Sequence, residues 1–211
     1  SKAKLIWWHH HYPWYFSWNA NVYIKLKGFL EKLLIRNIDL IIVNSKYLQD
    51  SIKDIYKIDS KILYPVLDDK FLNYNSENKN KVLSTTKTIF TYGRWVEGKN
   101  LKLIFEAYDD LRLRCRDLTL IIWGEWDKLD YYKNKYKKDN KVKFLWFIGK
   151  TEIIKNLEKS NLFLFPSKVD SFWLVILESM SIWVPVISYN LSGAKEIINN
   201  WINWYLVNTD S

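Results

Sequence analysis

Residues 166–189 have the sequence PSKVDSFWLVILESMSIWVPVISY, and this stretch decides the fold. Asp170 and Glu178 stand eight residues apart across the start of an apolar helix, about 12 Å along its axis at about 1.5 Å per residue. The apolar run at 184–188 predicts a buried strand directly after the helix. A helix that leads straight into a buried strand is typical of an α/β protein with a parallel sheet.

Strands and helices alternate along the rest of the chain, which predicts parallel sheets covered by helices. Ser45 and Asn100 precede two of the helices and are expected to cap them with their side chains. The predicted strands are 2–7, 39–43, 61–64, 88–92, 118–122, 142–145 and 162–165, and the predicted helices are 21–36, 46–56, 101–111, 128–138 and a short one from Thr151.

A polar segment rich in Asn and Lys interrupts this alternation, and the pattern restarts after it. We therefore expect a first domain at 1–67, a linker at 68–84 and a second domain at 85–211. The chain begins with Ser1, so we expect its true N-terminus to be absent.

Composition limits the classes of protein that fit. With 211 residues, 48% hydrophobic and 26% charged, the chain can bury one large core or two modest ones and is not disordered. It has no apolar run of about 18 residues, and we expect no secretory signal, because no charged start followed by an apolar stretch is visible. The single cysteine, Cys115, fits a reducing compartment. The net charge of +9 favours nucleotides, phospholipid head groups or nucleic acid as partners, or is a solvated lysine-rich surface.

The stretch at 166–189 resembles the E-x7-E element of retaining GT-B glycosyltransferases of the family-4 type, PSxxEGFGLxxLEAMAxGxPVI. The resemblance implies an α/β protein of GT-B type with two Rossmann-like lobes, the N-terminal lobe incomplete and the C-terminal lobe nearly complete. Residues 1–67 would be the later part of the acceptor-side domain, and 85–211 the nucleotide-sugar-binding domain of a fragment.

A second motif, G-R-x4-K, begins at Gly93 and places Arg94 and Lys99 between a predicted strand and a predicted helix, where phosphate groups bind. It resembles the GRLxxxKG loop of the same family. The resemblance implies that both cations grip the donor diphosphate and replace a metal as it departs.

The resemblance also assigns the two carboxylates. It implies that Glu178 binds the ribose and that Asp170 binds the donor sugar, whereas capping or solvated carboxylates are the alternative. Asp170 is one methylene shorter than the glutamate usual in the family, which leaves the sugar open.

Four further positions belong to the implied donor site. The backbone N–H groups of Trp173, Leu174 and Val175 would face the diphosphate at the start of the helix. Ile148 matches a position whose backbone contacts the base. The indole of Trp173 is expected to crowd the pocket, because the family has glycine there.

Three histidines, His9, His10 and His11, precede Tyr-Pro. Neighbours on an extended segment point to opposite faces, so we expect no metal site there. His11 resembles the histidine of the HYP loop that faces the donor sugar, and His10 is the next candidate. Asp68 and Asp69 lie in the predicted linker, not in a metal-binding D-x-D loop.

The implied function is transfer of a hexose from a nucleotide-sugar to a saccharide or lipid-linked acceptor, with retention of the anomeric configuration. The resemblance implies that the reaction needs no metal and no cofactor, and the nucleotide-diphosphate sugar is a co-substrate. We expect a cytoplasmic protein that can touch the anionic inner face of a membrane and binds no nucleic acid. An all-β carbohydrate-binding module and a basic nucleic-acid-binding protein are the alternatives.

The chain contains 12 tryptophans but only 6 glycines, where about 15 glycines are usual for this length. The tryptophans are sugar-stacking residues, marks of divergence, or glycines encoded by a reassigned stop codon, and we favour the last. We expect a glycine-restored protein to be more stable and to bind donor better. The clearest positions at which the family has glycine are Trp126, Trp146, Trp173, Trp183, Trp201 and Trp204.

Overall fold

The structure is a computed structural model that describes residues 4–9, 29–74, 87–93, 95, 98–124, 128–146, 148–168, 170, 172–191, 193–199, 202 and 204–208. The chain divides into two compact units. One comprises Ser1–Val66 and Asp170–Phe172, and the other comprises Leu67–Val169 and Trp173–Ser211. Each unit is described by itself.

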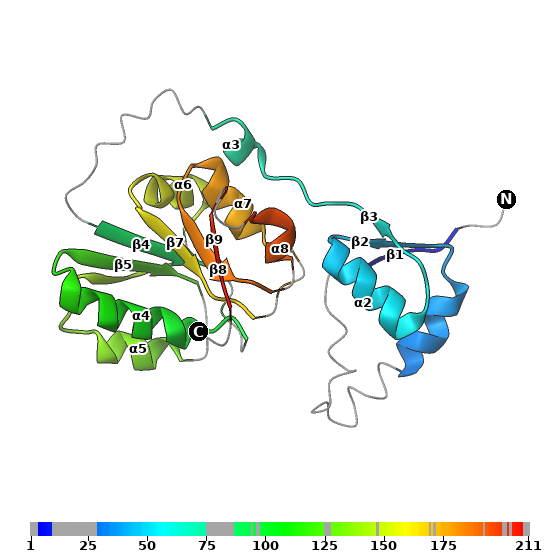
Figure 1. The fold of residues 1–211 in the computed structure, drawn as a ribbon, viewed down its shortest axis with the longest axis horizontal. Helices are drawn as coiled ribbons and strands as arrows, with labels where there is room; N and C mark the ends of the chain where they lie inside the picture. Colours follow the sequence, from blue (N-terminus) through cyan, green and yellow to red (C-terminus); the bar gives the residue numbers. More distant parts are fainter. Residues whose placement is uncertain are drawn as a thin grey trace. The chain divides into compact units, whose positions relative to one another are not determined.

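The first unit contains a three-stranded parallel sheet, in the order β1-β2-β3. The strands are β1 (Ile6–His9), β2 (Leu40–Val43) and β3 (Lys61–Ile62). Helix α2 (Lys46–Tyr56) packs against β2 and β3 (Figure 1). The hydroxyl of Ser45 accepts the N–H of Leu48 at 3.1 Å, which confirms the predicted cap. A core of Ile41, Val43, Leu48 and Ile52 lies between helix and sheet.

The second unit contains a six-stranded parallel sheet in the order β6-β5-β4-β7-β8-β9. Its strands are β4 (Lys87–Tyr92), β5 (Leu118–Trp123), β6 (Val142–Leu145), β7 (Leu162–Phe165), β8 (Val186–Tyr189) and β9 (Tyr205–Val207). Its helices are α3 (Asp69–Leu72), α4 (Leu101–Arg114), α5 (Leu129–Lys135), α6 (Lys150–Glu158), α7 (Leu174–Ser181) and α8 (Ala194–Ile197).

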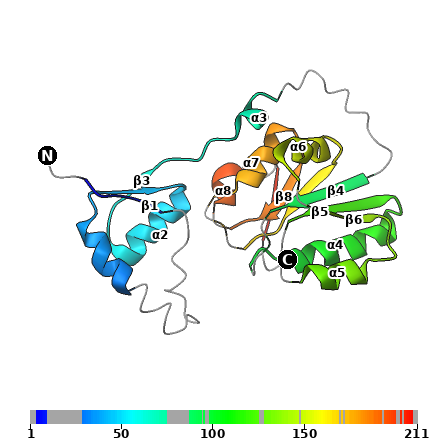
Figure 2. The ribbon, with the colours of Figure 1, turned by 180° about the vertical axis from the view of Figure 1, so that it is seen from behind.

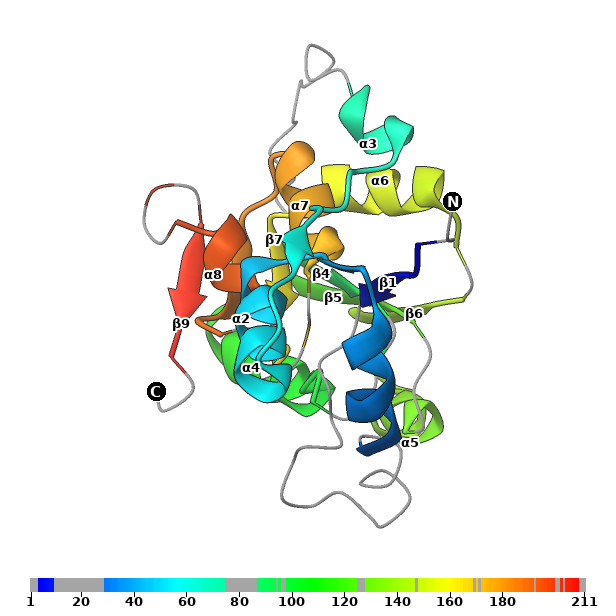
Figure 3. The same cartoon turned by 90° about the vertical axis from the view of Figure 1, so that its right-hand side faces the viewer.

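Helices cover both faces of this sheet. In all three views α4 and α5 lie on one face, and α6 and α7 lie on the other (Figures 1, 2 and 3). The central strands β4 and β5 are therefore almost entirely buried. Their near-continuous apolar sequences are those of parallel strands with no solvent-facing side.

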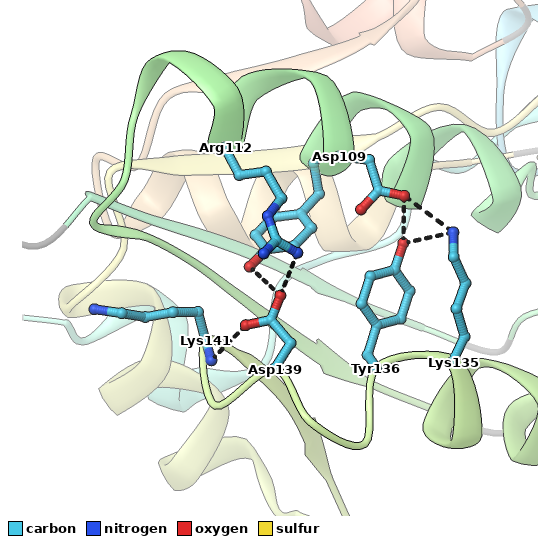
Figure 4. Close-up of polar contacts among 7 residues, drawn as sticks. Asp109, Arg112, Lys135, Tyr136, Asp139 and Lys141 are labelled. Carbon is cyan, nitrogen blue, oxygen red and sulfur yellow. Dashed lines mark hydrogen bonds and ion pairs between the residues drawn. The ribbon is translucent and has the colours of Figure 1, made fainter.

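A polar network joins α4 to α5 and to the turn before β6 (Figure 4). Asp109 accepts hydrogen bonds from the Tyr136 hydroxyl at 2.8 Å and from the Lys135 ammonium at 3.0 Å. Asp139 accepts one from Tyr108 at 3.1 Å and pairs with Arg112. These contacts fix the layer that covers one face of the sheet.

The alternation of strands and helices confirms the predicted α/β class, and the alternative of an all-β carbohydrate-binding module is wrong. Asn100 precedes α4 as predicted, but its side chain does not cap the helix: its φ is +54° and its amide donates to the Tyr189 hydroxyl at 3.2 Å. The start of the helix predicted at 21–36 lies outside the described residues, whereas 29–34 are helical.

The first residues of the predicted linker form a helix. Residues 69–72 form α3, and Phe71 is buried in the core of the second unit. An apolar side chain in a polar segment therefore attaches this part of the chain to the second unit. Within the described part of the chain, no helix combines the length and the apolar character that a membrane span requires.

Candidate donor site

The strand order of the second unit reverses between β4 and β7. From β4 the chain continues to β5 and β6 on one side, and from β7 to β8 and β9 on the other. In open α/β sheets, ligands bind outside the carboxyl ends of the strands at such a point. The residues that follow β4 and β7 are therefore the first place to look for a site.

The loop after β4 approaches the loop after β5 very closely. Gly93 and Gly124 have φ values of +149° and +134°, which favour glycine. A Cβ on Gly124 would lie 1.9 Å from the carbonyl oxygen of Gly93. The indole of Trp95 is buried beside them and donates to the carbonyl of Trp123 at 2.9 Å. These contacts hold the start of the G-R-x4-K loop against the sheet.

The far end of the same loop reaches β7. The carbonyl of Gly98 accepts the N–H of Lys168 at 2.7 Å. The ammonium of Lys99 lies 5.2 Å from the ring centroid of Phe165, the last residue of β7. Lys99 thus lies at the switch point, as a phosphate-binding cation would. Arg94 lies outside the described residues.

Glu178 is half-buried in the middle of α7, and the hydroxyl of Tyr92 donates to its Oε2 at 2.5 Å. Tyr92 ends β4, so this bond ties α7 to the strand at the switch point. Burial raises the pKa of the Glu178 carboxyl above its ordinary value, and the Tyr92 bond and the charge of Lys150 lower it in part. Burial and the Glu178 charge raise the pKa of Tyr92, which remains a neutral donor.

A second carboxylate and a lysine lie within electrostatic reach of Glu178. Lys150, the first residue of α6, pairs with Asp68 at 2.7 Å, and the charges of both act on Glu178. Asp68 also accepts the N–H of Lys70 and so caps α3. No sequence motif singled out Lys150 or Tyr92, and Asp68 was predicted only to lie in the linker. One signal in the sequence points to Tyr92 as a site residue: it ends a predicted strand immediately before Gly93, the first residue of the G-R-x4-K motif.

The start of α7 is formed by the predicted residues. Trp173 occupies the N-cap position, Leu174 and Val175 begin the helix, and both are half-buried. The indole of Trp173 is fully buried and packs edge-on against Phe165, with ring centroids 5.4 Å apart. Ile148 is half-buried and packs against the core just before α6.

The remaining predicted site residues belong to the first unit or lie outside the described residues. Asp170 belongs to the first unit, whereas Trp173 and Glu178 belong to the second. His10 and His11 lie outside the described residues, and His9 ends β1. The roles inferred for Asp170 and His11 therefore stay predictions. Among the residues that the structure describes, no three His, Cys, Asp or Glu side chains gather closely enough to hold a metal ion.

The tryptophans at glycine-like positions differ from one another. Trp183, just after α7, has a φ of +61° and is 65% exposed. Two other described members, Trp146 and Trp173, have no positive φ. Trp126 and Trp201 lie outside the described residues. Among the described family-glycine positions, Trp183 is therefore the one at which a positive φ favours glycine.

Comparison with known proteins gives a family match over the second unit. The model of the family described as "Glycosyl transferases group 1" matches residues 74–211. An uncharacterized glycosyltransferase of Bacillus subtilis, YqgM, is 30% identical over 156 residues, which cover 71% of this chain and 42% of YqgM. An uncharacterized 41.2 kDa protein of the cps region of Klebsiella pneumoniae is 27% identical over 91% of this chain and 53% of its own length. The chain thus spans about half the length of these curated relatives.

Solved structures share the fold. Sucrose-phosphate synthase from Thermosynechococcus elongatus superposes with a TM-score of 0.79 at 17% identity, over 100% of this chain and 56% of that one. HepE from Anabaena, solved in complex with UDP and glucose, superposes with a TM-score of 0.75 at 20% identity, over 97% of this chain and 58% of HepE. These likenesses confirm the predicted GT-B fold class.

Proposed function

We propose, for a chain that belongs to the family glycosyl transferases group 1, that the second unit binds a nucleotide-diphosphate sugar and that the whole protein transfers its hexose to a saccharide or lipid-linked acceptor. We further propose a retaining, metal-independent transfer of the family-4 type. The solved complexes of HepE with UDP-glucose and with UDP and glucose support a nucleotide-sugar donor.

One observation carries the proposal. Glu178 is half-buried at the switch point of the sheet and is held there by Tyr92 from β4. A carboxylate in this place accepts hydrogen bonds from a vicinal diol such as that of ribose. Burial makes the ionised carboxylate costly unless it is paired, and hydroxyl donors of a ligand would supply further partners.

The departing diphosphate needs positive charge. Lys99 lies over Phe165 at the same edge of the sheet and would supply a cation there. The start of α7, at Trp173, Leu174 and Val175, adds backbone N–H groups and the positive end of the helix dipole. Together with Arg94 from the same loop, these groups would stabilise the leaving group without a metal.

The partners and the compartment follow from weaker signals. We place the reaction in the cytoplasm, because a single cysteine suits a reducing compartment. The net charge of +9 would favour contact with the anionic inner face of a membrane that carries a lipid-linked acceptor. Nucleic acid is not among the proposed partners.

The test is nucleotide binding by the full-length protein, measured by calorimetry with UDP and with GDP in the presence of EDTA. Glu178→Gln and Lys99→Met should each weaken binding of one nucleotide about tenfold, the effect of losing about 1.4 kcal/mol. Glu106→Gln and Lys102→Met are the matched controls, because this exposed pair lies on α4 and is joined at 3.0 Å.

Binding of one nucleotide that depends on Glu178 and Lys99 but not on Glu106 or Lys102 is the expected result. Equal affinities in all four variants would overturn the donor site. Affinity that disappears in EDTA would overturn metal independence.

A further inference from the structure

Tyr92 lies at the carboxyl end of β4, and aromatic neighbours hold its ring there. The side chain is only 2% exposed. The ring stacks on Phe90 of the same strand, with centroids 5.3 Å apart, and packs against Phe163 of β7 at 5.2 Å. Phe90 and Phe163 are themselves partners in the pairing of β4 with β7. The position of the Tyr92 hydroxyl is therefore set by the central strands of the sheet.

The carboxylate that this hydroxyl meets has more freedom of its own. Glu178 lies on α7, which is anchored by the buried residues Ile176 and Ser179. A glutamate side chain has three rotatable bonds, and ordering them costs conformational entropy. The Tyr92 hydroxyl donates to Oε2 of Glu178 at 2.5 Å. This bond offsets the entropic cost and keeps the carboxylate in one orientation.

Tyr92 uses only part of the acceptor capacity of Glu178. A carboxylate has two oxygens with about four lone-pair sites, and the bond from Tyr92 goes to one of the two oxygens. The remaining sites can accept hydroxyl groups of a ligand at the switch point. A site built to bond a hydroxyl group rejects an analogue that lacks it, because polar atoms of the site are then left without a partner. An acceptor that is already oriented makes this discrimination without a further entropic cost.

We propose that Tyr92 is a positioning residue of the donor site. Its hydroxyl holds the Glu178 carboxylate in the orientation that accepts the ribose diol, and the site thereby selects a nucleotide with an intact diol over its 2′-deoxy form. The inference rests on the proposed function, because it assigns the diol to Glu178. It goes further by assigning the selectivity to a strand residue that acts through Glu178.

The experiment measures selectivity rather than affinity. Full-length protein is titrated by calorimetry with UDP and 2′-deoxy-UDP, and with GDP and 2′-deoxy-GDP. The wild type should bind the ribose form of one nucleotide at least about tenfold more tightly than its 2′-deoxy form, and Tyr92→Phe should reduce this ratio to about twofold. A bond that only stabilised the fold would leave the ratio unchanged, because the folded fraction affects both forms equally.

Two variants isolate the hydroxyl of Tyr92. Tyr108→Phe is the matched control, because Tyr108 is also buried and donates to a carboxylate, that of Asp139, at 3.1 Å in the network that joins α4 to the turn before β6. It should keep the ratio of the wild type. Tyr92→4-aminophenylalanine keeps the ring and carries a weaker N–H donor, so its ratio should lie between those of the wild type and Tyr92→Phe.

A double-mutant cycle tests whether Tyr92 acts through Glu178. Glu178→Gln should itself lower the ratio of the ribose form to the 2′-deoxy form. Adding Tyr92→Phe to Glu178→Gln should change the ratio no further, because the two residues act as one unit. Additive effects of the two substitutions would contradict a role that passes through Glu178.

The outcomes separate this inference from the proposed function. Nucleotide binding that depends on Glu178, with one ratio in the wild type and in both Tyr92 variants, would overturn the role of Tyr92 and leave the donor site standing. Equal binding of the ribose and 2′-deoxy forms by the wild type would overturn the selectivity. If Tyr92→Phe does not fold, the 4-aminophenylalanine variant decides, and its ratio must still lie below that of the wild type. If the wild type binds none of the four nucleotides, the proposed function fails and this inference fails with it.

Discussion

The hydroxyl of Tyr92, at the carboxyl end of β4, donates a hydrogen bond to the carboxylate of Glu178 in the middle of α7. The two residues are 86 positions apart in the sequence. Their bond joins the strand and the helix on either side of the switch point. It also gives a half-buried carboxylate a partner that stays neutral, because burial raises the pKa of Tyr92 well above its ordinary value.

Tyr92→Phe should destabilise the protein by about 1–3 kcal/mol, because the half-buried carboxylate of Glu178 loses its partner. The ring and its packing remain in the variant, so the loss of stability measures the contribution of the hydroxyl group. Urea unfolding at pH 7 measures it, with Tyr131→Phe as the control on an exposed ring. A Tyr92→Phe variant as stable as the control would mean that the bond adds nothing.

Glu178 should make the stability fall as pH rises. Its folded pKa is raised above the ordinary value of 4.5, mainly by burial. The folded state therefore holds a proton that the unfolded chain has released, and this contribution is full below the unfolded pKa and is lost as pH rises through the folded pKa.

The free energy of unfolding of the wild type should therefore fall relative to that of Glu178→Gln from about pH 4.5 upward. Urea unfolding of both proteins between about pH 4 and pH 8 gives the difference. Parallel curves would show that Glu178 titrates normally in the folded protein.

Gly124→Ala should destabilise the protein by about 3 kcal/mol or more, because the new Cβ would meet the Gly93 carbonyl at 1.9 Å in a strained backbone conformation. Gly149→Ala is the matched control, since a Cβ there meets nothing within 4 Å. Thermal unfolding of both variants tests the contrast. Equal melting temperatures would show that the two loops separate easily.

Trp183→Gly should stabilise the protein by about 1 kcal/mol, because glycine adopts the φ of +61° without a Cβ clash and the indole is mostly exposed. Trp146→Gly is the control at an exposed position without positive φ. If the tryptophans are misread glycines, the six family-glycine positions should all be encoded by UGA. Ordinary UGG codons there would contradict that interpretation.

Trp173→Gly should destabilise the protein, in contrast to Trp183→Gly. The indole is fully buried against Phe165, so its loss leaves a cavity and should cost about 3–5 kcal/mol. We therefore expect glycine to raise the stability at Trp183 and to lower it at Trp173. Chemical unfolding of Trp173→Gly, compared with Trp183→Gly, shows whether the two changes have opposite signs.

Local pattern in the sequence determined the elements and the class of the fold. Near-continuous apolar runs predicted β4, β5 and β7, because strands that are covered on both faces have no solvent-facing side that would need polar residues. The Ser45 cap was predicted for the same local reason: its partner, Leu48, lies three residues away. Asn100 failed as a cap because a distant residue, Tyr189, binds its side chain instead.

The sequence also singled out Lys99 and Glu178, because each belongs to a motif of fixed spacing. Only the tertiary structure shows that Tyr92 bonds Glu178, that Gly124 lies against Gly93, and that Asp68 holds Lys150 beside the site. These pairs join residues far apart along the chain. Their contacts follow from the strand order, since a sheet that reverses between β4 and β7 brings together chain segments that no local pattern relates.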